Sequence, residues 1–154
     1  MIRFNIKGNI DVDVFHESQP TDMMLSHRIE LDPTNAQATH LAQAAGVARF
    51  AYNWALGQWN DIYQLHKLDP DVVPTSEAEL RRALNALKRE HYPWMLAVTK
   101  CAPQMAIKNL GKAFDNFFAG RSGYPRFKAK GRDDRFTLSN DQFRVDGSRI
   151  HIPK

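Results

Sequence analysis

Apolar residues recur every three or four positions over a long stretch in the first half of the chain. The stripe consists of Leu41, Ala45, Ala48, Tyr52, Ala55, Trp59 and Ile62, which is the spacing of one helix face. Asp32-Pro33 supplies an N-cap and a first-turn proline, and Thr34 and Gln37 have the spacing of a capping box. We therefore predict a helix over residues 33–65. Its small residues would let a second helix approach closely.

Two shorter helical patterns follow. Ser76 and Glu79 form a second capping-box pair and predict a helix to about residue 90. Pro93 ends this helix, because the residue before a proline is driven out of helical conformation. Pro103 begins a third helix with apolar positions at 107, 110, 114 and 117, and Gly120 is its expected C-cap.

The large apolar residues are most simply core residues that bury much surface. They are Trp54, Trp59, Trp94, Phe114, Phe117 and Phe118. Gly111 lies inside the third predicted helix, where glycine costs about 1 kcal/mol relative to alanine. A glycine at that position favours close packing of another helix against it.

Both ends of the chain alternate between apolar and polar residues, which is the period of a β-strand. Residues 2–14 alternate on either side of Lys7-Gly8-Asn9 and predict a hairpin, while residues 16–22 resemble a linker. Shorter alternating runs occupy 28–31, 126–130 and 136–138. Residues 143–145 and 149–152 predict a second hairpin with its turn centred on Asp146-Gly147. A strand before the helices and strands after them would join in one small sheet, which makes an α+β fold.

Basic residues concentrate near the C-terminal end. Residues 121–154 hold nine Lys or Arg against four Asp or Glu, whereas residues 1–120 hold twelve against thirteen. Six cations interleave with Tyr124 and Phe127, namely Arg121, Arg126, Lys128, Lys130, Arg132 and Arg135. Cations neutralise phosphates and rings stack on bases, so this segment indicates nucleic acid, with a solvated basic loop as the alternative. Contact with five or six duplex phosphates would give log affinity a slope of about −5 against log salt.

The residues offer no recognisable active site. The six histidines are scattered, and no pair has zinc-ligand spacing. Cys101 is the single cysteine, which excludes an internal disulfide framework and is typical of a buried thiol in a reducing cytoplasm. The adjacent Asp133 and Asp134 would make a poor two-metal site, since neighbours on a strand point to opposite faces. We interpret them as turn residues that relieve repulsion among the cations. We expect no catalytic residue, no metal and no cofactor.

Arg49 and Asn53 lie four residues apart on the first predicted helix and share a face. One interpretation is a polar pair exposed to a nucleic-acid backbone or base edge. The other is a surface arginine and asparagine beside core aromatics. From these two residues alone, the second interpretation is favoured.

Three stretches together resemble the TnpB (OrfB) proteins that bacterial insertion sequences encode. The first is residues 49–56, Arg-Phe-Ala-Tyr-Asn-Trp-Ala-Leu, and the second is residues 110–118, Leu-Gly-Lys-Ala-Phe-Asp-Asn-Phe-Phe. The third is residues 123–130, Gly-Tyr-Pro-Arg-Phe-Lys-Ala-Lys, followed by Phe-Thr-Leu at 136–138. Their order and spacing agree with the family over about residues 26–154.

The resemblance implies an N-terminal half built as a β-barrel wedge interrupted by a helical recognition lobe, which older descriptions call a helix-turn-helix domain. In this family of RNA-guided DNA nucleases, related to type V CRISPR effectors, that half grips the guide RNA and the guide–target heteroduplex. The family's nuclease half uses three acidic residues, metal ions and a zinc-binding insert. None of these has a counterpart before Lys154. We therefore expect a cytoplasmic bacterial or archaeal protein, without membrane partners and without activity of its own.

The combined expectation is a three-helix bundle inserted between a short N-terminal strand and C-terminal antiparallel strands of a small, incomplete β-barrel. We divide the chain into an N-terminal extension at 1–25, a first barrel strand at 26–32, a helical recognition lobe at 33–120 and a basic β segment at 121–154.

The leading hypothesis is a nucleic-acid-binding fragment whose partners are guide RNA and DNA. The expected binding residues are Arg49, Tyr52, Asn53, Arg121, Tyr124, Arg126, Phe127, Lys128, Lys130, Arg132 and Arg135. The first alternative is a helix-turn-helix transcriptional regulator that uses the cations of the second predicted helix. The second alternative is an interaction subunit that pairs with a separate nuclease chain.

Overall fold

The computed structural model describes the backbone of residues 2–5, 9–14 and 25–152, and side chains from Glu30 onward except that of Asn140. The elements in chain order are β1 (Ile2–Asn5), β2 (Asn9–Val14), β3 (Leu25–Glu30), α1 (Asn35–Leu68), α2 (Glu77–Leu87), the 3-10 helix η1 (Pro93–Ala97), α3 (Cys101–Phe118), β4 (Arg135–Leu138), the 3-10 helix η2 (Asn140–Gln142), β5 (Arg144–Asp146) and β6 (Arg149–His151). The predicted linker at 16–22 lies outside the described residues.

Strands from both ends of the chain share one antiparallel sheet, which confirms the predicted α+β fold. The strand order is β3-β2-β1-β4, and the sheet is open. Asn5 lies opposite Asn9 between β1 and β2, which confirms the first hairpin, although its turn lies outside the described residues. β1 and β2 precede β3 in the chain and belong to the same sheet, in which β2 pairs with β3 and β1 pairs with β4.

The second hairpin is also confirmed, with a shifted turn. β5 and β6 pair antiparallel with Asp146 opposite Arg149, so the turn consists of Gly147 and Ser148. Gly147 has a φ of 54°, a left-handed conformation that glycine adopts without steric cost. This hairpin is a sheet of its own among the described residues, separate from the four-stranded one.

Each of the first two helices begins at a capping box. Thr34 is the N-cap of α1, where the Thr34 N–H donates to Gln37 Oε1 at 2.8 Å. The predicted cap at Asp32 is therefore wrong, because the threonine two residues later satisfies the free amides of the first turn. Ser76 caps α2 in the same way, as predicted. α2 ends at Leu87, before the predicted boundary, and η1 follows without having been predicted.

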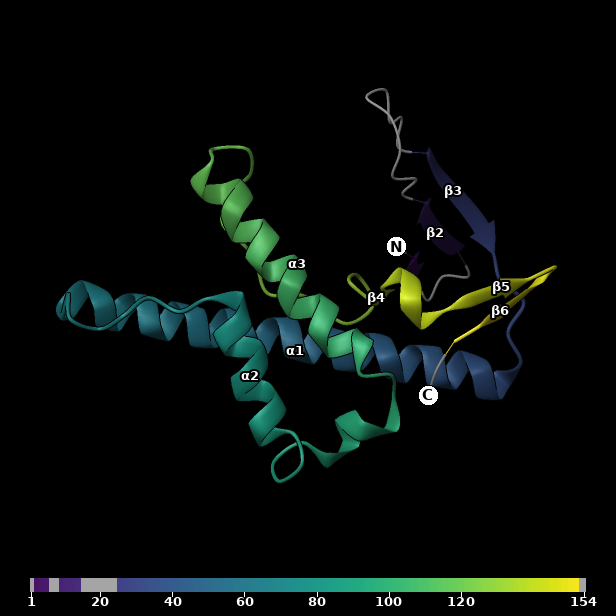
Figure 1. Cartoon of the computed structure of the whole chain (residues 1–154), viewed down its shortest axis with the longest axis horizontal. Helices are drawn as coiled ribbons and strands as arrows, with labels where there is room; N and C mark the ends of the chain where they lie inside the picture. The colour runs from purple at the N-terminus through teal and green to yellow at the C-terminus, as the bar shows by residue number, and fades with distance from the viewer. Residues whose placement is uncertain (1, 6–8, 15–24, 153–154) are drawn as a thin grey trace.

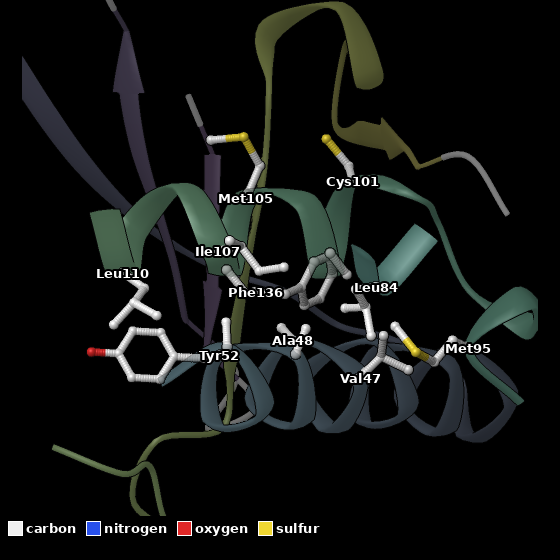
Figure 2. Close-up of a cluster of buried hydrophobic side chains, with 14 of the residues drawn as sticks. Val47, Ala48, Tyr52, Leu84, Met95, Cys101, Met105, Ile107, Leu110 and Phe136 are labelled. Carbon is white, nitrogen blue, oxygen red and sulfur yellow. The ribbon is translucent and has the colours of Figure 1, made fainter. Parts of the chain in front are cut away.

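The core lies where α3 crosses α1, and it extends to the sheet through β4 (Figure 1). The alanines of the α1 stripe are buried, which confirms that small residues let α3 approach. Ile107 and Leu110 of α3 and Phe136 of β4 fill this interior (Figure 2). None of the described helices is long and apolar enough to cross a membrane.

Two residues predicted for the core lie on the surface instead. Trp94 is 48% exposed and Phe118 is 69% exposed. η1 is a short turn that buries only Met95, so the neighbouring Trp94 faces outward and makes an edge contact with the Phe50 ring at 4.9 Å. Phe118 is the last residue of α3, beyond the part of the helix that the core covers.

Close packing at Gly111 is confirmed. The residue is buried, and a Cβ added there would lie 3.0 Å from the Cβ of Glu77. The first turn of α2 therefore rests on the bare backbone of α3. A Cβ at this position would require Glu77 to shift by a few tenths of an ångström.

Two glycine-to-alanine substitutions should have opposite effects on the free energy of unfolding. Gly57 lies inside α1 with open space around its Cβ position, so Gly57→Ala should raise stability by about 0.5–1 kcal/mol through helix propensity. Gly111→Ala should instead lower stability, because overpacking of the contact with Glu77 costs about 1–3 kcal/mol and offsets the helix-propensity gain of about 1 kcal/mol. Urea denaturation measures both changes, and an equal gain at the two sites would contradict the packing described here.

Candidate nucleic-acid interface

The basic residues lie on a return segment, residues 121–134, which leads from the end of α3 back to β4 (Figure 1). The predicted strand at 126–130 is wrong, because this stretch has no strand conformation and both Phe127 and Ala129 are exposed. Pro125 is buried and brings no N–H to a strand ladder. The backbone groups nearby bind side chains rather than a neighbouring strand.

Three side chains of α1 hold the return segment in antiparallel order. Tyr124 donates its hydroxyl to Asn60 Oδ1 at 2.6 Å, Asn53 binds the backbone of Lys128, and Arg49 forms an ion pair with Asp134. At 100° per residue, positions 49, 53 and 60 lie within about 40° of one another around the helix. We call Arg49, Asn53 and Asn60 the polar ladder.

The contact of Asn53 is bidentate. Its Nδ2 donates to the Lys128 carbonyl at 2.9 Å, and the Lys128 N–H donates to its Oδ1 at 2.8 Å. The carboxamide thus replaces the peptide group that a neighbouring strand would supply. One side chain satisfies both backbone groups of Lys128, and the segment needs no strand partner there.

The side chain of Lys128 lies over the ring of Tyr52. The ammonium is 3.8 Å from the ring centroid, which is a cation–π geometry. Tyr52 itself is buried at 6% exposure. Burial raises the pKa of the Tyr52 hydroxyl, and the negative charge of Asp133 raises it further. The ring therefore stays neutral at physiological pH and presents its π face to the cation.

Asp133 and Asp134 shape the turn around Gly131. Asp133 Oδ2 accepts the Ala129 N–H at 3.0 Å, and Asp134 Oδ2 accepts the Gly131 N–H at 2.7 Å. Gly131 has a φ of 83°, which a residue with a Cβ adopts only under strain. The two carboxylates thus do more than relieve repulsion: each one holds a backbone amide in place.

Asp133 also pairs with two arginines. Its carboxylate lies 2.9 Å from Arg132 Nε and 3.7 Å from an Arg135 nitrogen. The Ala129 amide, and after it these guanidinium groups, lower the pKa of Asp133. A lowered folded-state pKa means that Asp133 stabilises the fold above its unfolded pKa, and that this contribution is lost as the pH falls through the folded pKa.

Other cations of the segment face solvent without an acidic partner. Arg126 and Lys130 are exposed and have no hydrogen bond or ion pair with the residues that the structure describes. Phe127, which lies between Arg126 and Lys128 in the sequence, is 54% exposed. Arg121 is exposed and donates from Nε to Asn116 Oδ1 at 3.0 Å, a neutral partner that leaves its charge in place. These side chains are available to a polyanion.

Tyr124 packs edge-on against two rings of α3. Its ring centroid lies 5.6 Å from that of Phe114 and 5.1 Å from that of Phe117. Burial raises the pKa of the Tyr124 hydroxyl, and the nearby Tyr63 contributes in the same direction. The residue is still 43% exposed, so one side of it remains open to solvent.

The sequence-predicted site residues therefore divide into two groups. Arg49, Tyr52 and Asn53 lie under the return segment and bind it. The other predicted residues lie on the segment itself, except Arg135, which begins β4. Sequence reasoning missed Asn60, Asp133 and Asp134 as partners. The available signal was local: glycine and aspartate are both typical turn residues, and an aspartate carboxylate in a turn often accepts a nearby backbone amide. Among the described residues, no three His, Cys, Asp or Glu side chains are placed to hold a metal ion.

A family model described as a helix-turn-helix domain, for OrfB proteins, matches residues 23–67. In the structure these residues contain β3 and nearly all of α1, which is one continuous helix. The next helix, α2, lies beyond the matched range.

Curated relatives match a larger part of the chain. “Putative RNA-guided DNA endonuclease InsQ” of Escherichia coli (strain K12) is 28% identical over 82% of this chain and 31% of its own length. “Putative RNA-guided DNA endonuclease” of Streptomyces pristinaespiralis is 33% identical over 64% of this chain and 23% of its own length. “Virulence protein VsdF” of Salmonella dublin is 32% identical over 70% of this chain and 95% of its own length.

The chain thus spans less than a third of the two endonuclease relatives and nearly all of the third relative. The model match covers β3 and nearly all of α1, and the relatives extend the similarity over most of the chain. Sequence, family model and relatives agree: the chain belongs to the TnpB (OrfB) family of insertion-sequence proteins and corresponds to the N-terminal part of that family.

Proposed function

We propose that this chain binds guide RNA, target DNA or their heteroduplex through the return segment, and that it does so without cutting them. The observation that carries the proposal is the exposure of Arg126 and Lys130 on a segment that α1 holds in place. Names of relatives that describe RNA-guided endonucleases support the choice of ligand. The protein would act in the cytoplasm, where its nucleic acids are.

The number of cations that lack an acidic partner sets how many phosphates this surface can neutralise. Arg121, Arg126 and Lys130 have no acidic partner among the described residues. Arg132 and Arg135 share the single carboxylate of Asp133 and together carry one surplus charge. Three or four phosphate contacts give a salt slope of about −3 to −4 on a duplex, which is shallower than the value of about −5 expected from the sequence.

We assign catalysis to the nuclease domain of the family and not to the residues that the structure describes. The described residues contain no acidic cluster that could hold a metal ion, and hydrolysis of a phosphodiester by a two-metal site needs several such carboxylates. In this proposal the chain supplies recognition. Cleavage belongs to a nuclease domain, either in the same protein or in a separate chain.

A transcriptional regulator that reads DNA with α2 is the second candidate. Arg81, Arg82, Lys88 and Arg89 offer cations on or just after this helix. Arg81 Nε lies 2.7 Å from Glu77 Oε2, so this pair neutralises one of them within the helix. The family-model description favours this candidate, whereas the absence of α2 from the matched range weakens it.

An interaction subunit is the third candidate. The described part of the sheet is open at both edges, and the β5–β6 hairpin forms a separate two-stranded sheet. Unpaired strand edges are templates for another chain. Light scattering that finds stable oligomers in the absence of nucleic acid would favour this candidate over the first.

Neutralising the exposed cations should weaken binding and make it less dependent on salt. In Arg126→Gln/Lys130→Gln, the slope of log affinity against log salt should fall in magnitude by about 0.9 per residue on a duplex and about 0.7 on a single strand. Fluorescence anisotropy with a labelled RNA hairpin and a labelled DNA duplex, repeated over a range of salt concentrations, measures this slope. The matched control is Arg82→Gln/Arg89→Gln, which removes two exposed charges near α2. A larger loss in the control would favour the regulator over the proposed function.

The purified chain should not cleave DNA. Incubation with supercoiled plasmid and Mg²⁺, with and without the bound RNA, should leave the plasmid supercoiled, because the described residues lack a carboxylate cluster for metal ions. Agarose gel electrophoresis detects nicking directly. Metal-dependent nicking that survives further purification would overturn the proposed division of labour.

A further inference from the structure

We propose that the polar ladder positions the return segment and does not itself contact nucleic acid. Arg49, Asn53 and Asn60 would act as positioning residues that fix the segment in its binding conformation. This inference rests on the proposed function, because it assigns a cause to the geometry of the same surface. It gives Arg49 and Asn53 a different role from the direct contact expected from the sequence.

The polar groups of Asn53 and Arg49 are already engaged within the protein. Asn53 uses both its oxygen and its nitrogen on the backbone of Lys128. Arg49 is paired with Asp134, and both side chains are about four-fifths buried, at 19% and 20% exposure. A phosphate that recruited Arg49 would have to break this ion pair and leave the Asp134 carboxylate without its counter-charge. Contact with the ligand is therefore costly for these residues.

The segment needs an external support to be ordered. Residues 123–130 have neither helix nor strand conformation, and they include Gly123, Pro125 and small residues. A free segment of this kind would lose conformational entropy on binding, which lowers the affinity. The ladder removes this loss in advance, since its three contacts fix the segment at Tyr124, Lys128 and Asp134.

The same contacts decide which side chains face solvent. With Lys128 held to Asn53 through its backbone and to Tyr52 through its ammonium, the neighbouring Phe127 is left exposed. Lys130, two residues further, is exposed as well. A segment released from the ladder would present these groups in many arrangements, and only some would fit a regular phosphate backbone. Positioning thus explains why α1 residues that touch no ligand would still affect binding.

Amide hydrogen exchange in the full chain separates positioning from contact. The Ala129 N–H binds Asp133 and the Gly131 N–H binds Asp134, so neither acceptor is altered in Asn53→Ala. Positioning predicts that both amides exchange about tenfold faster in this variant, because the whole segment opens. It also predicts an affinity for the labelled RNA hairpin and DNA duplex about tenfold lower, with an unchanged salt slope. Asn109→Ala is the matched control, since the side chain of Asn109 in α3 has no hydrogen bond with the described residues.

Tyr124→Phe is a milder variant should Asn53→Ala fail to fold. It keeps the ring that packs on Phe114 and Phe117 and removes only the hydroxyl that binds Asn60. Positioning predicts faster exchange of the Ala129 and Gly131 amides and weaker binding, both by a smaller factor than in Asn53→Ala. Weaker binding with unchanged exchange of the two amides would overturn the inference, because it would show direct contact. Faster exchange with unchanged affinity would overturn it as well.

Arg49 gives an independent test through the salt slope. Because Asp134 already neutralises Arg49, Arg49→Gln should weaken binding without changing the slope. Arg126→Gln should reduce the slope by about 0.9 on a duplex. Equal reductions in the two variants would show that Arg49 meets a phosphate and would overturn the inference. A wild-type chain that binds neither probe would overturn the proposed function, and amide exchange would then still report whether the ladder holds the segment.

Discussion

The bidentate contact between Asn53 and the backbone of Lys128 is the interaction on which the functional surface depends. A peptide segment that is neither helix nor strand must still satisfy its N–H and C=O groups. Asn53 does this with one side chain, at 2.9 Å and 2.8 Å, and so replaces a strand partner. By fixing the backbone of Lys128, this contact also fixes the positions of the nearby cations Arg126 and Lys130.

This contact also explains why two distant sequence motifs belong together. The helix motif at residues 49–56 and the Gly-Tyr-Pro-Arg-Phe-Lys motif at 123–128 form the two sides of one interface. Arg49, Tyr52 and Asn53 lie beneath, and the return segment lies above. The middle of α1 is therefore a scaffold with two sides: its alanines pack against α3, and the polar ladder binds the segment that leads to β4.

Much of the fold could be predicted because its signals are local. Capping boxes at Thr34 and Ser76 and apolar stripes at helical spacing fix helix starts and faces within a few residues of sequence. The return segment could not be predicted in this way. Its alternation of rings and cations is typical of a strand, but its partner lies 75 residues earlier on α1. Sequence reasoning found the residues of this surface, while their division into supporting and exposed groups needed the tertiary contacts of Asn53, Asp133 and Asp134.

The pairing of β1 with β4 joins the beginning of the chain to a strand that follows all three helices. Ile2 lies opposite Leu138, so that sheet contact closes only after the ribosome has produced nearly the whole described chain. The helices can pack as they emerge, whereas the β1 edge stays without its partner until β4 arrives. Contacts of such long sequence separation form slowly, because their loop-closure entropy is lost before they gain any stabilisation. During synthesis the four-stranded sheet is therefore completed only when β4 pairs with β1, after all three helices have been made.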